Sequence, residues 1–254
     1  MKLSALIVAR NEEKRLPACL AGIAFADEIV VVLDRTTDAS EKIATAAGAK
    51  TISGEWPREG DRRNAGIAAC TNDWILEVDA DELVSPALAA EIRAVVSASN
   101  AARHSIPVDN YIGERLVRYG WGASFGKSGY WGLFRKGNKI WGRERVHPKI
   151  VLTGDAGAPL VHPIKHEVDR NLSETIKRLD RYSDARAADL RETGDKDDTK
   201  RYVRRFFSRF WKCYVARKGY REGGYGLVIA ALAGLFPLVS HLKAKHETPP
   251  DAKG

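Results

Sequence analysis

Two aspartates at the end of a largely apolar run, Asp79 and Asp81, are the side chains of this sequence best suited to chemistry. The run Trp74–Val78 has the composition of a strand, and residues i and i+2 of an extended backbone point the same way. Ligands of open α/β sheets bind at such carboxyl strand ends. The pair suits Mg²⁺ or Mn²⁺ carrying a diphosphate, because one or two carboxylates plus substrate usually hold these ions. The pattern indicates a nucleotide-sugar site, and the alternative is a solvated acidic turn that caps the next helix.

The first hundred residues alternate between strand and helix patterns, which would supply the sheet that positions these aspartates. Short apolar runs, the second of them strongly β-branched, predict buried parallel strands at 3–9, 28–33, 50–52 and 74–79. Helical spacing and end signals predict helices at 16–23, 38–47, 60–70 and 85–98. Asp38 and Glu41 have the spacing of a capping box, and Ser85 with Pro86 supplies a cap and a first-turn proline. The sequence therefore predicts a doubly wound α/β half.

Composition sets the limits within which this site must be built. With 254 residues and 44% hydrophobic content, the chain can bury the core of one large domain or of one and a half domains. Cys19, Cys70 and Cys213 are odd in number and lack Cys-x-x-Cys spacing, so the sequence indicates neither a disulfide framework nor a zinc site. The apolar run Leu3–Ala9 is too short for a signal-peptide core and is expected to be a first strand.

The net charge of +8 comes from one segment. Nine Lys or Arg residues and no acid lie between Lys200 and Arg221, whereas the rest of the chain carries 32 basic and 33 acidic residues. On a helical wheel this segment separates into a basic half, with Arg201, Arg204, Arg205, Arg209 and Lys212, and a mainly aromatic half, with Tyr202, Val203, Phe206, Phe207, Phe210, Trp211, Cys213 and Tyr214. A membrane-surface helix, a nucleic-acid patch and a packed helix with a basic outer face all fit this pattern.

A second apolar stretch follows the basic segment. Gly223–Leu242 contains no Asp, Glu, Lys or Arg, and 20 uncharged residues approach the length of a transmembrane helix. Four glycines, Pro237, Ser240 and His241 dilute the stretch, and basic residues flank both ends. We therefore expect peripheral attachment to an anionic membrane surface, with a true membrane span and a soluble core helix as the alternatives.

Several short motifs occur in a characteristic order along nearly the whole chain. They are Val8–Glu13, Asp27–Asp34 with Thr37-Asp38, Arg63-Asn64, Asp79–Glu82, Trp131–Arg135, Val146-His147, Leu160–His162, and Leu172-Ser173 through Arg181–Ser183. Each motif is weak alone, but the order and spacing of the set are fairly specific. The sequence resembles family 2 glycosyltransferases, and within them the branch similar to lipopolysaccharide-core glucosyltransferases.

The resemblance implies a GT-A-like fold, which is α/β with a doubly wound, mostly parallel sheet and flanking helices, followed by a helical C-terminal extension. It also implies roles for individual residues. Asp34 would accept a hydrogen bond from uracil, Asp79 would lie by the ribose or the metal, and Asp81 would bind the metal. The other residues of the implied donor site are Ala9, Arg10, Asn11 and Glu12 around the base and ribose, and Arg63 near the base and diphosphate with Asn64 supporting it. Arg10 and Arg62 fit equally well as solvated surface residues.

The resemblance further implies an inverting displacement, in which an acceptor hydroxyl attacks the anomeric carbon and a general base accepts its proton. Many relatives carry an acid after the Val-His pair, but here Pro148 follows His147. Glu144 is therefore our candidate base, with Asp155 as its substitute, although Glu144 could also be a solvated surface residue. His147 and His162 fit structural roles as well as catalytic ones.

These inferences predict a metal-dependent hexosyltransferase. A nucleotide sugar, with UDP-hexose the first choice, would be the donor, and a hydroxyl of a glycan or glycolipid such as lipopolysaccharide core would be the acceptor. The expected organisation is a catalytic domain at 1–170, with a donor half at 1–100 and an acceptor half at 101–170, a membrane-associating helical region at 171–246, and a flexible tail at 247–254. We expect a cytoplasmic protein attached peripherally to the inner face of the membrane, with no nucleic-acid partner.

Two other classes of function stay open at this point. A sugar nucleotidyltransferase shares the α/β layout and the need for metal, but the loop that follows the first strand lacks the expected phosphate-binding glycines. A non-catalytic binder of anionic lipid or nucleic acid would account for the basic segment but would leave Asp34, Asp79 and Asp81 without a purpose. Salt-dependent retention on nucleic acid without nucleotide-sugar binding would favour that second class.

Overall fold

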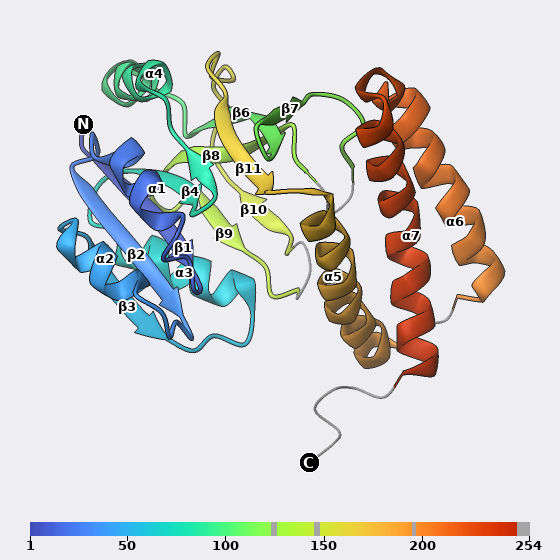
Figure 1. Ribbon diagram of the computed structural model, residues 1–254. Helices are drawn as coiled ribbons and strands as arrows, with labels where there is room; N and C mark the ends of the chain where they lie inside the picture. The colour runs from blue at the N-terminus through green and yellow to red at the C-terminus, as the bar shows by residue number, and fades with distance from the viewer. Residues whose placement is uncertain (123–125, 145–147, 195–196, 248–254) are drawn as a thin grey trace. The chain divides into compact units, whose positions relative to one another are not determined.

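The structure is a computed structural model that describes residues 1–122, 126–144, 148–194 and 197–247 (Figure 1). The chain divides into two compact units. Unit 1 contains Met1–Asp109, Gly129–Glu144 and Pro148–His166. Unit 2 contains the described residues within Asn110–Ser128 and Glu167–Gly254. Residues 248–254 of the predicted tail, and His147, lie outside the described residues.

Unit 1 begins with the alternation of strands and helices that the sequence predicts. The elements are β1 (Leu3–Ala9), α1 (Leu16–Ile23), β2 (Glu28–Asp34), α2 (Ser40–Ala46), β3 (Lys50–Gly54), α3 (Glu59–Ala69) and β4 (Trp74–Asp79). The four strands are parallel and lie in the order β3-β2-β1-β4. Because β2 and β4 flank β1, the strand order reverses beside β1, and such a reversal is the usual ligand position of this architecture.

The sheet then continues with antiparallel neighbours. Later along the chain come α4 (Pro86–Ala98) and four more strands of this sheet, β5 (Glu82–Leu83), β6 (Arg103–Ile112), β8 (Gly129–Arg135) and β11 (Ile164–Asp169). The full strand order is β3-β2-β1-β4-β8-β6-β11-β5, in which β8 is antiparallel to both β4 and β6. A separate hairpin pairs β9 (Lys139–Trp141) with β10 (Ile150–Leu152).

Both faces of the central strands are buried, which explains why those strands read as continuous apolar runs. Ala5 and Ile7 of β1 pack into a cluster with buried residues of α1, α2 and α4. Leu6 points to the opposite face and packs with Val32 and with Ile67 of α3. The helices therefore cover the sheet on two sides, as expected for a doubly wound fold.

The two predicted helix caps have different outcomes. The side chain of Ser85 accepts a hydrogen bond from the N–H of Leu88 at 3.2 Å and caps α4, as predicted. The capping box predicted for α2 is wrong, because α2 begins at Ser40 and has no side-chain cap. Asp38 instead accepts hydrogen bonds from the N–H and Oγ of Ser40, and Glu41 accepts one from Ser53. Asp38 thus holds the turn before α2, and Glu41 links α2 to β3.

Unit 2 is mainly helical. It contains β7 (Arg115–Val117), which pairs with the end of β6, then α5 (Leu172–Thr193), α6 (Thr199–Trp211), the π-helical turn η2 (Lys212–Ala216), the 3-10 turn η3 (Gly219–Glu222) and α7 (Gly224–His246). Within this unit α7 packs against both α5 and α6 (Figure 1). Ile229, Ala233 and Phe236 of α7 lie in the core of the unit.

By length and composition alone, the helix α7 could cross a membrane. However, 56% of its most apolar 18-residue segment is buried inside the protein. A Cβ atom added to Gly234 would lie only 2.8 Å from the carbonyl oxygen of Phe206, so α6 and α7 approach closely. The ring of His241 stacks on that of Tyr202 with 4.2 Å between centroids. Lys243 forms an ion pair with Asp180 of α5 at 2.6 Å. These contacts make α7 the central helix of unit 2, as in the core-helix alternative.

Candidate active site

The register of the parallel strands brings the predicted donor-site residues to one edge of the sheet. Val8 of β1 lies beside Val32 of β2 on one side and beside Asp79 of β4 on the other. Ala9 and Asp34 are therefore at the same carboxyl edge as Asp79, next to the reversal of strand order. This is the expected ligand position of such a sheet.

The loop after β1 is tied to the loop after β2. Asn11 has a φ of 56°, a conformation that asparagine tolerates better than most residues, and its Oδ1 accepts a hydrogen bond from the N–H of Thr37 at 2.8 Å. The N–H of Glu12 donates to Oγ of Ser40 at 2.9 Å. Arg10 is exposed beside them. Asn11 and Glu12 thus shape the rim of the site through contacts made within the protein.

Asp34 is deeply buried and fully surrounded by donors. The carboxylate accepts hydrogen bonds from Arg35 at 3.0 and 3.2 Å, from Nη1 of Arg62 at 3.0 Å and from the N–H of Trp56 at 3.1 Å. Burial acts to raise its pKa, but the hydrogen bond from Arg35 and the others outweigh burial, so the pKa of Asp34 is lowered. The carboxylate is therefore ionised, and a uracil N–H would have to share it with these protein donors.

Arg63 is held immediately behind Asp79. The guanidinium binds Oδ1 of Asp79 at 2.9 Å, Oε1 of Glu77 at 2.7 Å and Oε1 of Glu59 at 2.8 Å. Burial disfavours its charge, but Asp79 and the two glutamates outweigh that effect and raise the pKa of Arg63. Asn64 does not contact Arg63 through any bond that the structure shows and instead pairs with the main chain of Trp141 at 2.9 and 3.0 Å. Arg63 orients Asp79, and Asn64 fastens α3 to β9.

A buried ion pair beneath the site was not anticipated from the sequence. Nζ of Lys139 lies 2.6 Å from Oε2 of Glu77, and both side chains are almost completely buried. Lys139 also donates to the carbonyl of Trp131 at 2.9 Å. Burial acts to raise the pKa of Glu77, but Lys139 and Arg63 together lower it. The one signal in the sequence was an acid, Glu77, in the middle of an otherwise apolar strand.

The second aspartate of the pair meets a histidine that is distant in the sequence. Oδ2 of Asp81 lies 3.5 Å from Nε2 of His166, and the Asp81 side chain is 26% exposed. The pairing of β5 with β11 sets this contact, because it places His166 directly opposite Glu82. Glu82 is buried and accepts hydrogen bonds from the N–H of Asp79 at 2.9 Å and from the hydroxyl of Tyr130 at 3.1 Å. Glu82 thus fixes the end of β4 and the turn that follows it, which carry Asp79 and Asp81. Neither aspartate caps α4.

These donors fit a divalent ion that arrives with a diphosphate. Asp79 and Asp81 supply carboxylate oxygens that are partly exposed at the strand end, and His166 supplies a nitrogen. Across the described residues, no group of three His, Cys, Asp or Glu side chains is arranged to hold a metal by itself. Mg²⁺ usually retains open positions for substrate phosphates rather than a complete protein cage, so a two-carboxylate site is chemically sufficient.

The candidate bases lie in different environments. Oε2 of Glu144 accepts a hydrogen bond from the N–H of Lys149 at 3.0 Å. A hydrogen bond from its own N–H, together with that from Lys149, lowers the pKa of the partly exposed Glu144. The carbonyl of Asp155 binds the N–H of Ala102, which precedes β6 at the edge of the sheet opposite the aspartate pair. Asp155 therefore cannot substitute as the base in this arrangement. His162 lies 2.8 Å from Glu91 and has a structural role.

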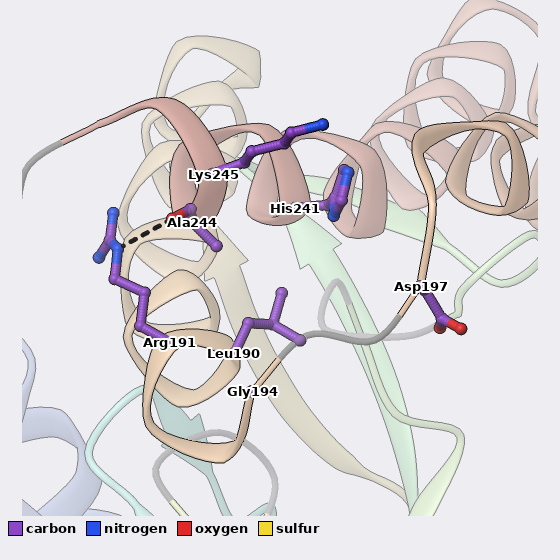
Figure 2. A pocket seen from close by; sticks show the side chains of 7 residues that line it. All are labelled: Leu190, Arg191, Gly194, Asp197, His241, Ala244 and Lys245. Carbon is purple, nitrogen blue, oxygen red and sulfur yellow. Dashed lines mark hydrogen bonds between the residues drawn. The ribbon is translucent and has the colours of Figure 1, made fainter.

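A cavity of about 390 Å³ lies in unit 2, and none of the predicted donor-site residues lines it. Figure 2 shows the side chains around it, which come from α5, α7 and the segment before α6: Leu190, Arg191, Gly194, Asp197, His241, Ala244 and Lys245. Arg191 donates to the carbonyls of Lys243, Ala244 and Glu247 at the end of α7. Arg191 thus caps the carbonyl groups at the C-terminal end of α7. We assign no ligand to this cavity.

Fold and site together define an α/β protein with a ligand edge at the reversal of its strand order. The glycosyl transferase family 2 model matches residues 4–140, more than half of the chain, and the chain belongs to this family. It is therefore a glycosyltransferase, and the nucleotidyltransferase and non-catalytic alternatives lose their support. The resemblance seen in the sequence motifs is confirmed.

Similar proteins extend this likeness over the whole chain. An uncharacterized glycosyltransferase of Rickettsia conorii is 24% identical over 99% of this chain and 95% of its own length. The lipopolysaccharide core biosynthesis glycosyltransferase LpsC of Rhizobium meliloti is 24% identical over 91% of this chain and 90% of its own. The crystal structure of S. aureus TarS 1-349 superposes with a TM-score of 0.50 at 12% identity, covering 88% of this chain and 75% of that one. The GT-A-like fold is thereby confirmed.

Proposed function

We propose that this glycosyltransferase moves a hexose from a UDP-sugar to a hydroxyl of a glycan or glycolipid acceptor, with inversion at the anomeric carbon. The observation that carries the proposal is the position of Asp79 and Asp81 at the carboxyl end of β4, beside the reversal of strand order, with His166 3.5 Å from Asp81. The likeness to LpsC supports lipopolysaccharide core as the class of acceptor.

Each residue of the site has a specific task in this proposal. Asp81 and Asp79, with His166 beside them, would hold Mg²⁺ or Mn²⁺, and the bound ion would stabilise negative charge on the departing nucleoside diphosphate. Arg63 keeps the Asp79 carboxylate in place, because the guanidinium is itself fixed by two glutamates. Asp34 and the rim from Ala9 to Glu12 would bind the uracil and ribose.

The direct test is a screen of nucleotide sugars, with release of nucleoside diphosphate as the signal. We expect release from one or more UDP-hexoses in the presence of Mn²⁺ or Mg²⁺, and we expect excess chelator to stop it. A set of GDP-, CMP- and dTDP-sugars serves as the comparison. Release from these sugars with none from UDP-hexoses would overturn the choice of donor, and release that persists in chelator would overturn the role of the metal.

Glu144→Gln tests the base. Glutamine keeps an oxygen that can accept the hydrogen bond from Lys149 but cannot take a proton, so the loop should stay intact. We expect turnover to fall about a hundredfold, within the usual range for a general base, while the affinity for the nucleotide sugar measured by calorimetry is unchanged. Turnover equal to that of the unmodified enzyme would remove Glu144 from the mechanism, and its lowered pKa would then reflect only its loop contacts.

A further inference from the structure

The outer face of α6 and η2 carries an exposed apolar row. Val203, Phe207, Trp211 and Val215 follow one another at intervals of four residues and are 40%, 62%, 65% and 36% exposed. Residues four apart on a helix lie on the same side, so these four side chains form one stripe. The ring of Phe207 contacts that of Phe206 edge to face, with 5.1 Å between centroids, but Phe207 and Trp211 each keep more than half of their surface exposed. Exposed aromatic surface of this extent points to a partner outside the unit.

A cationic row runs beside the apolar stripe. Lys200, Arg204 and Lys212 occupy the adjacent positions and are exposed. Within the described part of the chain, no acidic side chain forms an ion pair with any of the three, whereas Arg201 and Arg205 both pair with Asp197. The outer face, defined as the apolar row with this cationic row, is therefore both hydrophobic and positively charged.

The helical wheel grouped the apolar residues of α6 as one half, but the structure divides them between two surroundings. Tyr202 is buried, and Cys213 lies in the core of unit 2, where α7 packs. Phe207 and Trp211 point away from that core and are exposed. The aromatic half is therefore wider than the strip that α7 covers, and its uncovered part lies next to the cationic row.

We infer that this outer face binds the surface of an anionic phospholipid bilayer. Phe207 and Trp211 would enter the interface between headgroups and acyl chains, where aromatic side chains are favoured. Lys200, Arg204 and Lys212 would lie at the depth of the anionic headgroups. The inference goes beyond the proposed sugar transfer and does not depend on it. It keeps the predicted peripheral location at the inner face of the membrane. The sequence-based prediction gave a part in the attachment to both C-terminal helices, whereas this inference assigns it to α6 and η2 without α7.

Charge and chemistry favour a bilayer over other occupants of the face. A second copy of the chain would bring two cationic rows together, and among the described residues no acidic side chain forms an ion pair with either row. Like charges in close contact are unfavourable. A nucleic acid would gain from Phe207 and Trp211 by stacking, but Val203 and Val215 offer no ring on which a base could stack. An anionic bilayer offers an apolar interface to the apolar row and anionic headgroups to the cationic row.

The test is co-sedimentation of the full chain with vesicles of phosphatidylcholine containing phosphatidylglycerol. We expect binding at low salt that high salt releases only in part, because salt screens the cationic row and not the apolar one. Phe207→Ala with Trp211→Ala should weaken binding by at least about tenfold and make the remainder fully salt-sensitive. Arg204→Ala with Lys212→Ala should weaken it about 30-fold at low salt, since each basic side chain near such a surface changes binding about fivefold.

Ile176→Ala is the matched control, because Ile176 is a large apolar residue of α5 in the same unit and is 54% exposed. It should leave vesicle binding unchanged, and circular dichroism should show every variant folded. The inference is overturned if the intact chain stays in the supernatant at low salt, or if the Phe207 and Trp211 double variant binds as tightly as the intact chain. It is equally overturned if that double variant dissociates a dimer, or if the chain retains RNA or DNA and not vesicles.

Discussion

Asp81→Ala should lower sugar transfer by about a thousandfold or more while leaving the fold intact. Asp81 is partly exposed in the turn after β4 and lies 3.5 Å from Nε2 of His166, so we expect its truncation to leave no unpaired charge in the core. The loss should be large because a bound divalent ion contributes several kcal/mol to the stabilisation of the departing diphosphate. Activity, Mn²⁺ binding by calorimetry and thermal unfolding should be measured on the same preparations.

Asp73→Ala provides the control for that experiment. Asp73 precedes β4, at the opposite end of the strand from Asp81, and is exposed. Its truncation removes one negative charge from the same strand without touching the site, so transfer and Mn²⁺ affinity should both be retained. Chelator added to the unmodified enzyme should reproduce the Asp81→Ala phenotype. Full transfer by Asp81→Asn in the presence of chelator would contradict a metal-dependent mechanism.

The strands, the helices and the aspartate pair could be predicted because each depends on residues close together in the sequence. Continuous apolar runs identified β1, β2 and β4, and an acid at the end of such a run identified Asp79 and Asp81. Parallel order then follows from the short helical connections. The donor edge of the sheet thus follows largely from local sequence patterns and from the rule that ligands of open α/β sheets bind at the carboxyl ends of the strands.

The partners of those residues could not be predicted, because they depend on tertiary pairing. His166 reaches Asp81 through the pairing of β11 with the two-residue strand β5, which has no apolar periodicity of its own. Lys139 reaches Glu77 across 62 residues of sequence. Similarly, a helical wheel for α6 identifies an apolar side but cannot show how much of that side α7 covers. Tertiary contacts decided all three cases.

The buried pair of Lys139 and Glu77 predicts the second large effect, which concerns stability. Lys139→Met keeps the length of the side chain but leaves the Glu77 carboxylate without its nearest cation. Removing one partner of a buried ion pair typically costs about 3–5 kcal/mol, because the remaining charge stays desolvated. Urea unfolding followed by tryptophan fluorescence at pH 7 should show a loss of that size. Lys14→Met, which removes an exposed lysine from the same unit, should cost less than about 1 kcal/mol.

A second substitution and a pH series separate lost charge pairing from lost packing. Glu77→Gln combined with Lys139→Met should recover much of the stability, because a neutral amide has no charge to compensate. In the intact protein the pKa of Glu77 is lowered, so its contribution is complete above the ordinary glutamate pKa and is lost as the pH falls through the lower folded value. In Lys139→Met the folded pKa of Glu77 should be higher than in the intact protein, because one compensating cation is gone. The stability difference between the two proteins should therefore shrink on acidification. A difference that stays constant from pH 7 to pH 4 would show that Lys139 acts through packing and not through its charge.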